Sequence, residues 1–190
     1  MIIYHKFIVI LISLQTIFIS TMLPVFISFK INKNFDYNLE FPITWQIPLI
    51  ILITIIFKKN VVFGAFTIYL FLGLFILPIF HQGGSVGYLL TPNFGYLLGT
   101  YPLIRIIDNL NNKNKIHLFD FIKTGVLAIS VLHITGFFYS FIQMLFHKQA
   151  NIFLYNLGKY SIGKIGYHLL MLIPLSLLLK PINYIKYKKL

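Results

Sequence analysis

Long apolar segments recur along almost the whole length of this 190-residue chain. Hydrophobic residues make up 58% of the sequence, charged residues only 11%, and the mean hydropathy is +0.83. A typical soluble domain carries about 25% charged residues. The composition therefore excludes an ordinary soluble domain and predicts an integral membrane protein.

Six apolar segments approach the ~20 residues that a helix needs to cross the hydrocarbon core of a bilayer. They cover residues 7–29, 44–57, 61–80, 88–107, 121–146 and 165–185, and the clearest polar linkers cover residues 32–40 and 109–114. The sequence therefore predicts an all-α integral membrane protein. We expect a compact bundle of six transmembrane helices that forms a single domain over residues 1–190.

The net charge of +12 comes from basic residues scattered between the apolar segments. This distribution favours a lipid bilayer rather than a nucleic acid as the partner. With a cytoplasmic N-terminus, ten basic residues lie inside and five outside, as the positive-inside rule expects. The inner ones are Lys6, Lys58, Lys59, Arg105, Lys113, Lys115, Lys123, Lys186, Lys188 and Lys189, and the outer ones are Lys30, Lys33, Lys148, Lys159 and Lys164. We expect a multi-pass protein of the cell (plasma) membrane with both termini cytoplasmic.

A segment rich in glycine, proline and polar residues, at 77–99, separates two of the apolar segments. Pro78 limits the continuation of the preceding helix, and Gly83 and Gly84 allow backbone angles and close approaches that other residues resist. Spanning a membrane requires no such segment. Two interpretations follow, a loop that shapes a ligand site and a simple tight outer turn.

The end of this segment carries the signature of a helix start. Thr91 and Pro92 are typical of a cap and a first-turn residue. The resulting helix N-terminus would point toward the outer side of the bundle, where its free amides suit a carboxylate. Asn93 adds a side-chain donor and acceptor there.

Residues 64–99 closely resemble the signature region of the BioY family, the biotin-binding membrane proteins of energy-coupling-factor (ECF) transporters. That family has a Tyr-Leu-Gly stretch, Leu-Pro-Val-Phe, a glycine-rich loop and then GPTGGYLIGF. The residues in register here are Tyr69, Gly73, Leu77, Pro78, Phe80, Gly83, Gly84, Gly87, Pro92, Gly95, Tyr96, Leu97 and Gly99. Upstream, PITWQ at residues 42–46 resembles the family's PFTLQ at the entrance to the second helix.

The resemblance implies that the chain binds biotin on the outer side and mediates its uptake. It also implies an ECF transmembrane coupling subunit and ATPase subunits as partners, because this chain carries no nucleotide-binding motif. Biotin is then the substrate, and no cofactor is expected. The candidate ligand-binding residues are Gln46, Gly83, Gly84, Asn93, Tyr96, His133 and Lys180.

The last apolar segment departs from the family pattern. The family carries a motif like PGDLLK, whose aspartate and lysine help to hold the ligand, whereas this chain reads LSLLLK. Lys180 thus takes the lysine position and Leu177 the aspartate position, with Asn93 as a candidate replacement for the aspartate. A lone lysine in mid-span costs about 2.5–3.5 kcal/mol on insertion scales. Lys180 therefore needs a partner such as a bound carboxylate, or it extends to the inner interface.

Other polar residues within the apolar segments have two interpretations each. His133 forms a hydrogen bond across helices or contacts the ligand. Trp45 anchors the chain at the membrane interface or closes over the pocket beside Gln46. Arg105 and Asp108, three residues apart, are expected to pair at the inner end of their helix.

The first apolar segment lacks the alanine-rich stripe with which such proteins are thought to dock on the coupling subunit. It keeps one face of small residues, formed by Ser13, Thr16 and Ser20.

A second class of function is an intramembrane enzyme, which needs a nucleophile and base, or paired acidic and histidine ligands, inside the membrane. The chain has no cysteine, and its four acidic residues lie at or beyond the ends of the apolar segments. We therefore expect a protein that is not an enzyme. A third interpretation keeps the transport role but changes the ligand to another vitamin-like compound, and the missing aspartate favours it.

Overall fold

The computed structural model describes residues 2–32, 35–80, 83–148 and 150–188. The helices are α1 (Ile2–Met22), α2 (Gln46–Phe57), α3 (Lys59–Phe75), α4 (Pro92–Leu98), α5 (Thr100–Asp108), α6 (Leu118–His147), α7 (Ala150–Leu157), α8 (Gly163–Leu170), α9 (Leu172–Leu177) and α10 (Leu179–Lys188). Two strands, β1 (Pro24–Asn32) and β2 (Phe35–Thr44), form an antiparallel hairpin between α1 and α2. The described residues are mostly helical, which confirms the helical class of the prediction.

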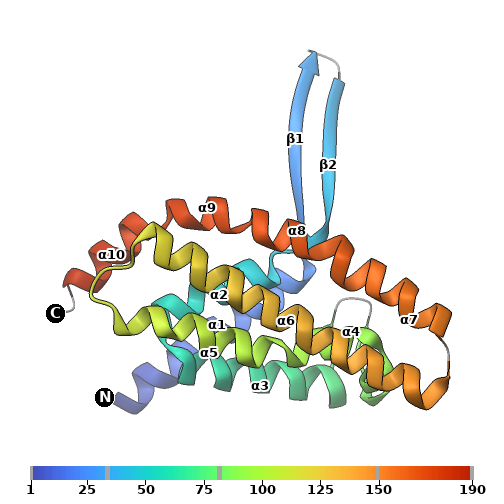
Figure 1. The fold of residues 1–190 in the computed structure, drawn as a ribbon. Helices are drawn as coiled ribbons and strands as arrows, with labels where there is room; N and C mark the ends of the chain where they lie inside the picture. The colour runs from blue at the N-terminus through green and yellow to red at the C-terminus, as the bar shows by residue number, and fades with distance from the viewer. Residues whose placement is uncertain (1, 33–34, 81–82, 149, 189–190) are drawn as a thin grey trace.

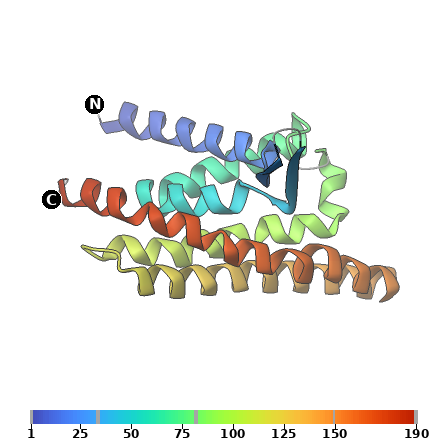
Figure 2. The same cartoon turned by 90° about the horizontal axis from the view of Figure 1, so that it is seen from above.

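The helices run along a common direction (Figure 1). Helices α7 to α10 follow one another as one long interrupted rod, which lies antiparallel to α6 (Figure 2). The start of α1 and the end of α10 lie at the same end of the bundle. An even number of membrane crossings would produce this arrangement.

One helix in the described part of the chain is long and apolar enough to cross a membrane, over Leu118–Phe146. Shorter apolar helices cover Lys6–Met22, Gln46–Phe57 and Lys59–Phe75. Helix α6 exposes the large apolar side chains of Leu127, Phe138 and Phe146, which a bilayer would cover. The full set of six crossings stays a prediction.

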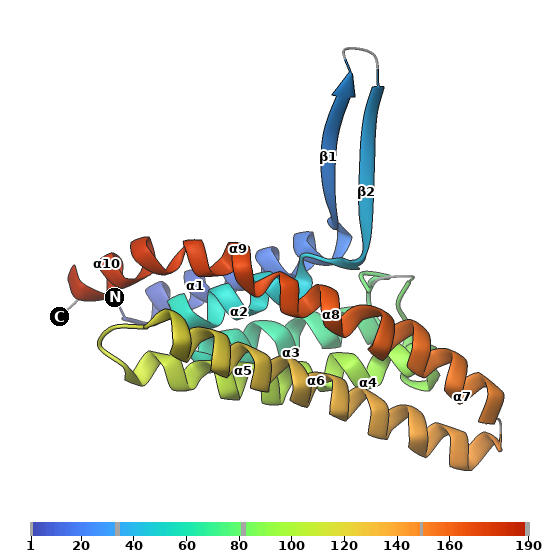
Figure 3. The same ribbon diagram turned by 45° about the horizontal axis from the view of Figure 1, so that its top comes forward.

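The region between α1 and α2 differs from the sequence-based expectation. The first helix was expected to reach residue 29 and to be followed by a polar linker, but α1 ends at Met22 and the hairpin begins at Pro24. The strands pair Pro24 with Thr44 and Phe26 with Glu40, and the hairpin stands away from the helices (Figure 3). The all-α assignment is therefore wrong for this segment.

Two local signals explain the hairpin. Pro24 disfavours helical backbone at the residue before it, so α1 stops there. Residues 35–41, reading FDYNLEF, alternate strictly between apolar and polar side chains, which is the period of a strand. This alternation was overlooked because the segment was judged by its number of apolar residues, as for a membrane span.

Glycines bring α4 and α5 close to α6. A Cβ atom added at Gly99 would lie 2.7 Å from the carbonyl oxygen of Leu132. Cβ atoms at Gly95 and Gly136 would collide with the rings of Tyr139 and Tyr96. Small residues that let helix backbones approach are the usual packing device inside membranes. Here they hold Tyr96 against α6.

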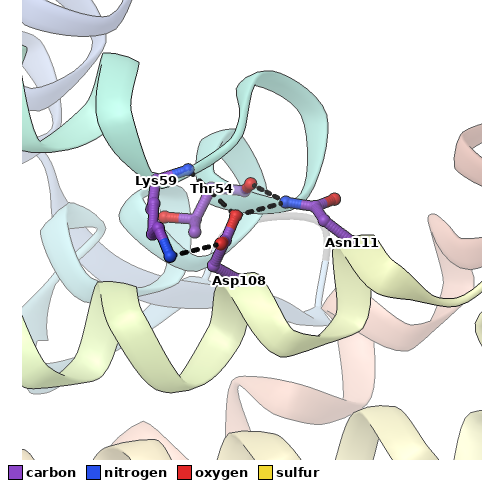
Figure 4. A network of polar contacts seen from close by, with 4 residues as sticks. All are labelled: Thr54, Lys59, Asp108 and Asn111. Carbon is purple, nitrogen blue, oxygen red and sulfur yellow. Dashed lines mark hydrogen bonds and ion pairs between the residues drawn. The ribbon is translucent and has the colours of Figure 1, made fainter.

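A polar network joins the end of α2, the start of α3 and the end of α5 (Figure 4). The Asp108 carboxylate accepts a hydrogen bond from the Lys59 backbone N–H at 3.0 Å and forms an ion pair with Lys59 Nζ at 3.6 Å. Asn111 Nδ2 donates to the Thr54 carbonyl at 2.8 Å and to Asp108 at 3.0 Å. The expected pair of Arg105 with Asp108 is wrong, because Asp108 lies over the α2–α3 turn and caps α3.

The small-residue face of α1 is used inside this chain. Ser13 and Ser20 are fully buried, and α1 packs on α3. The Thr21 hydroxyl lies 3.1 Å from the Tyr69 hydroxyl of α3. Ser13 and Ser20 of this face are therefore covered, whereas Thr16 stays partly exposed.

Candidate ligand-binding site

A cavity of about 320 Å³ lies where the base of the hairpin meets the helices. This volume falls in the range of about 300–1,000 Å³ that is usual for small-molecule sites. Its walls come from the hairpin base, α2, α3, α4, α5, α6, α8 and the turns before α4 and α8. The lining residues are Pro24, Glu40, Phe41, Pro42, Ile43, Thr44, Gln46, Ile47, Tyr69, Phe80, Tyr88, Asn93, Tyr96, Leu97, Thr100, Leu132, Tyr160, Lys164 and His168.

Three of the residues predicted from the sequence meet in this cavity. Gln46 comes from the first turn of α2, and Asn93 and Tyr96 come from α4. Within the described part of the chain, the buried Gln46 Nε2 and Tyr96 Oη atoms have no hydrogen-bond partner. Leaving a buried polar group unpaired costs about 1–3 kcal/mol. Both atoms are hydrogen-bond donors that a ligand in the cavity would satisfy.

Gly83 and Gly84 lie outside the cavity wall and shape the loop beside it. Gly83 has a φ of +122°, which disfavours any residue with a side chain. A Cβ atom at Gly84 would lie 2.6 Å from the Gly73 carbonyl oxygen. The loop folds back so that Gly83 forms a backbone bridge with Phe80. Phe80 then lines the cavity with its ring 4.7 Å from that of Tyr88.

Helix α4 begins at Pro92, as the sequence predicts, with Thr91 as the residue before it. The Thr91 hydroxyl does not cap the helix. It donates instead to the Tyr88 carbonyl at 2.8 Å, and the Tyr139 hydroxyl of α6 donates to the Leu89 carbonyl. These two bonds fix the turn that carries Tyr88 into the cavity wall.

Trp45 does not line the cavity. It packs in a small apolar cluster with Val25 and Ile43 of the hairpin base and with Tyr167 and Met171 near the C-terminal rod. This cluster fastens the hairpin base to α8. The interpretation in which Trp45 closes over the pocket is therefore wrong, and its role as an anchor at the membrane interface stays a prediction.

The cation of the cavity is Lys164, from the first turn of α8. Its Nζ lies 5.3 Å from the centre of the Tyr160 ring, and no carboxylate of the described residues is within ion-pair distance. Glu40, from β2, also lines the cavity. Lys180 is exposed in α10, away from the lining residues, so the structure does not bring it to this site.

His133 lies behind the cavity wall rather than in it. It is 3% exposed, and its Nε2 atom is 3.1 Å from Nδ1 of His168, which lines the cavity. Its Nδ1 atom is 3.2 Å from the Ser161 hydroxyl. The expected hydrogen bond of His133 across helices is confirmed.

The sequence reasoning missed Lys164 and His168. Lys164 was assigned to an outer loop, because the span was expected to begin one residue later. The signal that would have found them is their spacing of four residues, which places both on one face of α8. Glu40 was assigned to a linker because the hairpin was not expected.

Comparison with known proteins identifies the family of the chain. A family model described as "BioY family" matches residues 6–173, a range that ends before Leu177 and Lys180. A curated relative from Lysinibacillus sphaericus, named "Probable biotin transporter BioY", is 28% identical over 107 residues. That alignment covers 54% of this chain and 53% of the relative, so the chain spans about half of the relative's length. No solved structure matches the chain. Since the family model covers most of the sequence, the chain belongs to the BioY family.

Proposed function

We propose that this chain is the substrate-binding component of a biotin transporter, a single multi-pass domain in the plasma membrane. The observation that carries the proposal is the cavity in a BioY-family chain, lined by two buried donors and a lysine for which the described residues supply no hydrogen-bond or carboxylate partner, respectively. The name of the L. sphaericus relative supports biotin as the ligand.

The cavity wall suits the chemistry of biotin. The apolar bicyclic core and chain of biotin match the rings of Tyr69, Phe80 and Tyr88. Its ureido oxygen accepts hydrogen bonds, which Gln46 and Tyr96 supply. Its carboxylate requires a cation. Mostly apolar sites with a few placed polar groups are typical of small-molecule binding.

We assign the candidate residues different roles. Gln46, Asn93 and Tyr96 contact the ligand, and Lys164 binds its carboxylate. Gly83 and Gly84 act through the loop that positions Phe80 and Tyr88, and are the reason that this loop reaches the cavity. A direct contact of Lys180 with the ligand stays a prediction, and the position of Lys164 in the cavity wall favours Lys164 instead.

An ECF transmembrane coupling subunit and ATPase subunits would drive the transport. This part of the proposal rests on the absence of a nucleotide-binding motif from the sequence. Because Ser13 and Ser20 are covered by this chain's own packing while Thr16 stays partly exposed, docking on the coupling subunit would need more surface than this face of α1 provides.

Uptake of labelled biotin by a biotin-requiring bacterium tests the proposal. The chain is expressed alone and together with ECF coupling and ATPase subunits, beside cells that carry an empty vector. We expect biotin-dependent uptake, with stimulation by the added subunits. No uptake in either case would refute the function, and equal uptake in both would refute the need for partners.

Competition separates biotin from other vitamin-like ligands. Unlabelled desthiobiotin keeps the ureido ring and the carboxylate, so it should compete with labelled biotin. Thiamine and riboflavin should not compete. Stronger competition by either of the latter would assign the cavity to another compound.

A further inference from the structure

Three hydrogen-bonded polar side chains extend from the cavity wall into the packed interior. His168 of α8 lines the cavity, His133 of α6 lies behind it, and Ser161 closes the chain from the turn before α8. The nitrogen to nitrogen distance is 3.1 Å and the nitrogen to hydroxyl distance is 3.2 Å. Both histidines are buried, with 3% of the surface of His133 and 8% of that of His168 exposed.

Ser161 reaches this position because of an irregular helical turn. Gly158–Ile162 forms a π-helical turn between α7 and α8. A π-turn holds more residues than an α-turn, so it rotates the side chains around the rod, and such turns are frequent at functional sites. Here the rotation directs the Ser161 hydroxyl toward His133 on the neighbouring helix.

Each neutral imidazole ring has one N–H and one acceptor nitrogen. The hydrogen bonds among Ser161, His133 and His168 can therefore take only two arrangements. In the first, Ser161 donates to His133, His133 donates to His168, and His168 keeps an N–H on its Nε2 atom. In the second, every bond is reversed and this Nε2 atom is an acceptor. In both, Nδ1 of His168 is occupied by His133, so Nε2 is the nitrogen left for the cavity.

Lys164 selects between the arrangements in a cavity that Glu40 also lines. Lys164 lies one helical turn before His168 on α8, and both residues line the cavity. An acidic group drawn to Lys164 accepts hydrogen bonds, so it favours the arrangement in which His168 Nε2 carries the proton. Chains of hydrogen bonds that point the same way strengthen one another.

We propose that His168 contacts the acidic group of the ligand together with Lys164, and that His133 and Ser161 act as positioning residues that keep the His168 Nε2–H directed at it. This inference rests on the proposed function, because it assigns residues to the carboxylate end of the biotin site. It adds to the cavity a donor whose protonation is set from behind the wall.

The test compares the affinity for biotin with that for biotinamide, in which a neutral amide replaces the carboxylate. His168→Phe should weaken biotin binding about tenfold, as expected for a lost hydrogen bond to a charged group. Ser161→Ala, which removes one distant hydroxyl, should lower the ratio of the two affinities by about threefold, and Ser161→Thr should restore it. His117→Phe, in the loop before α6, is the matched control and should change neither affinity.

Nitrogen NMR of histidine-labelled protein in nanodiscs supplies a second measurement. Biotin should convert the His168 Nε2 signal to the protonated form in the wild type, but not in Ser161→Ala. Thermal unfolding checks that each variant is folded. If the wild type binds no biotin, the proposed function fails and this inference fails with it. If the wild type binds biotin while the affinity ratio and the Nε2 signal stay unchanged in Ser161→Ala, the inference alone is overturned.

Discussion

Tyr96 shows how a single residue in this molecule serves binding at the expense of stability. Its ring packs against α6 at Gly136 and lies 5.6 Å from that of His133, so its orientation is fixed. Its buried hydroxyl lies beside Ser161 but forms no well-aligned hydrogen bond with any described residue. A hydroxyl group that is fixed in position but unpaired is placed to bind a ligand.

Tyr96→Phe should therefore separate affinity from stability. We expect the affinity for biotin to fall by roughly two- to tenfold, because a neutral hydrogen bond contributes about 0.5–1.5 kcal/mol. The ligand-free protein should be as stable as the wild type or slightly more stable, since an unpaired buried hydroxyl is removed. Isothermal titration and thermal unfolding in detergent measure the two effects.

Tyr101→Phe is the matched control for this prediction. The Tyr101 hydroxyl already pairs with Thr67 at 2.9 Å, outside the cavity wall. The control should leave the affinity unchanged. A loss of affinity in Tyr101→Phe equal to that in Tyr96→Phe would contradict the assignment of Tyr96 to the site.

The two candidate cations can be compared directly. Lys164→Met should weaken biotin binding by roughly 10- to 150-fold, because a hydrogen bond to a charged group contributes about 1.5–3 kcal/mol. Lys159→Met removes the same charge from the same rod outside the cavity wall and should have little effect. Lys180→Met should resemble the Lys159 control. A larger loss of biotin affinity in Lys180→Met than in Lys164→Met would restore the ligand-binding role that the resemblance assigned to Lys180.

At the scale of elements, the contact of α4 and α5 with α6 determines the shape of the cavity. The cavity is lined by Leu97 of α4 and Thr100 of α5 on one side and by Leu132 of α6 on the other. Gly99 lies where α4 and α5 approach the backbone of α6. The methyl group of an alanine at this position would meet backbone rather than a flexible side chain. The helices would have to separate.

Gly99→Ala should lower the stability by about 1–3 kcal/mol, the usual cost of overpacking a tight interior. Gly166→Ala is the control, because a Cβ atom there meets nothing within 4 Å and alanine favours helix by about 0.5–1 kcal/mol. The fluorescence of the single tryptophan follows thermal unfolding of both variants. Equal unfolding temperatures would show that the helices are not in close contact at Gly99.

The sequence predicted some elements well and missed others for physical reasons. The glycine and proline pattern predicted the start of α4 and placed Asn93 beside it, since these depend on local backbone rules, whereas Gln46 and Tyr96 became candidates through the resemblance to the BioY family. The hairpin was missed because apolar residues are common both in strands and in membrane helices. Lys164 and His168 were missed because the other walls of the cavity, and His133 as the partner of His168, are distant in sequence, and only the folded chain brings α6, α8 and the hairpin together.

At the scale of the whole molecule, the hairpin base and α4, which line the cavity, lie away from the end of the bundle that carries both termini (Figure 1). The end with the termini is fastened by the contacts of Asp108 and Asn111 with the α2–α3 turn, and by Asn183, which exchanges hydrogen bonds with the Ile116 backbone. Together with the positive-inside rule, this predicts that the cavity opens to the outside of the cell.

Because the chain has no cysteine, a single introduced cysteine reports this orientation. Ser85 and Asn114 are both exposed, in the loop before α4 and in the connection between α5 and α6. A membrane-impermeant maleimide should label Ser85→Cys in intact cells and Asn114→Cys only after permeabilisation. The opposite pattern would invert the predicted topology.

The hairpin also limits how deeply the protein can sit in a bilayer. A two-stranded sheet leaves one row of backbone donors and acceptors unpaired along each strand, and hydrocarbon contains no water to satisfy them. We therefore expect Pro24 and Thr44, where the paired strands leave the bundle, to lie at the upper boundary of the lipid tails. Counting back from this boundary, the 21 residues of α1 extend over ~30 Å at ~1.5 Å per residue, close to the thickness of the hydrocarbon layer. The hairpin thus fixes the vertical register of the bundle against the membrane.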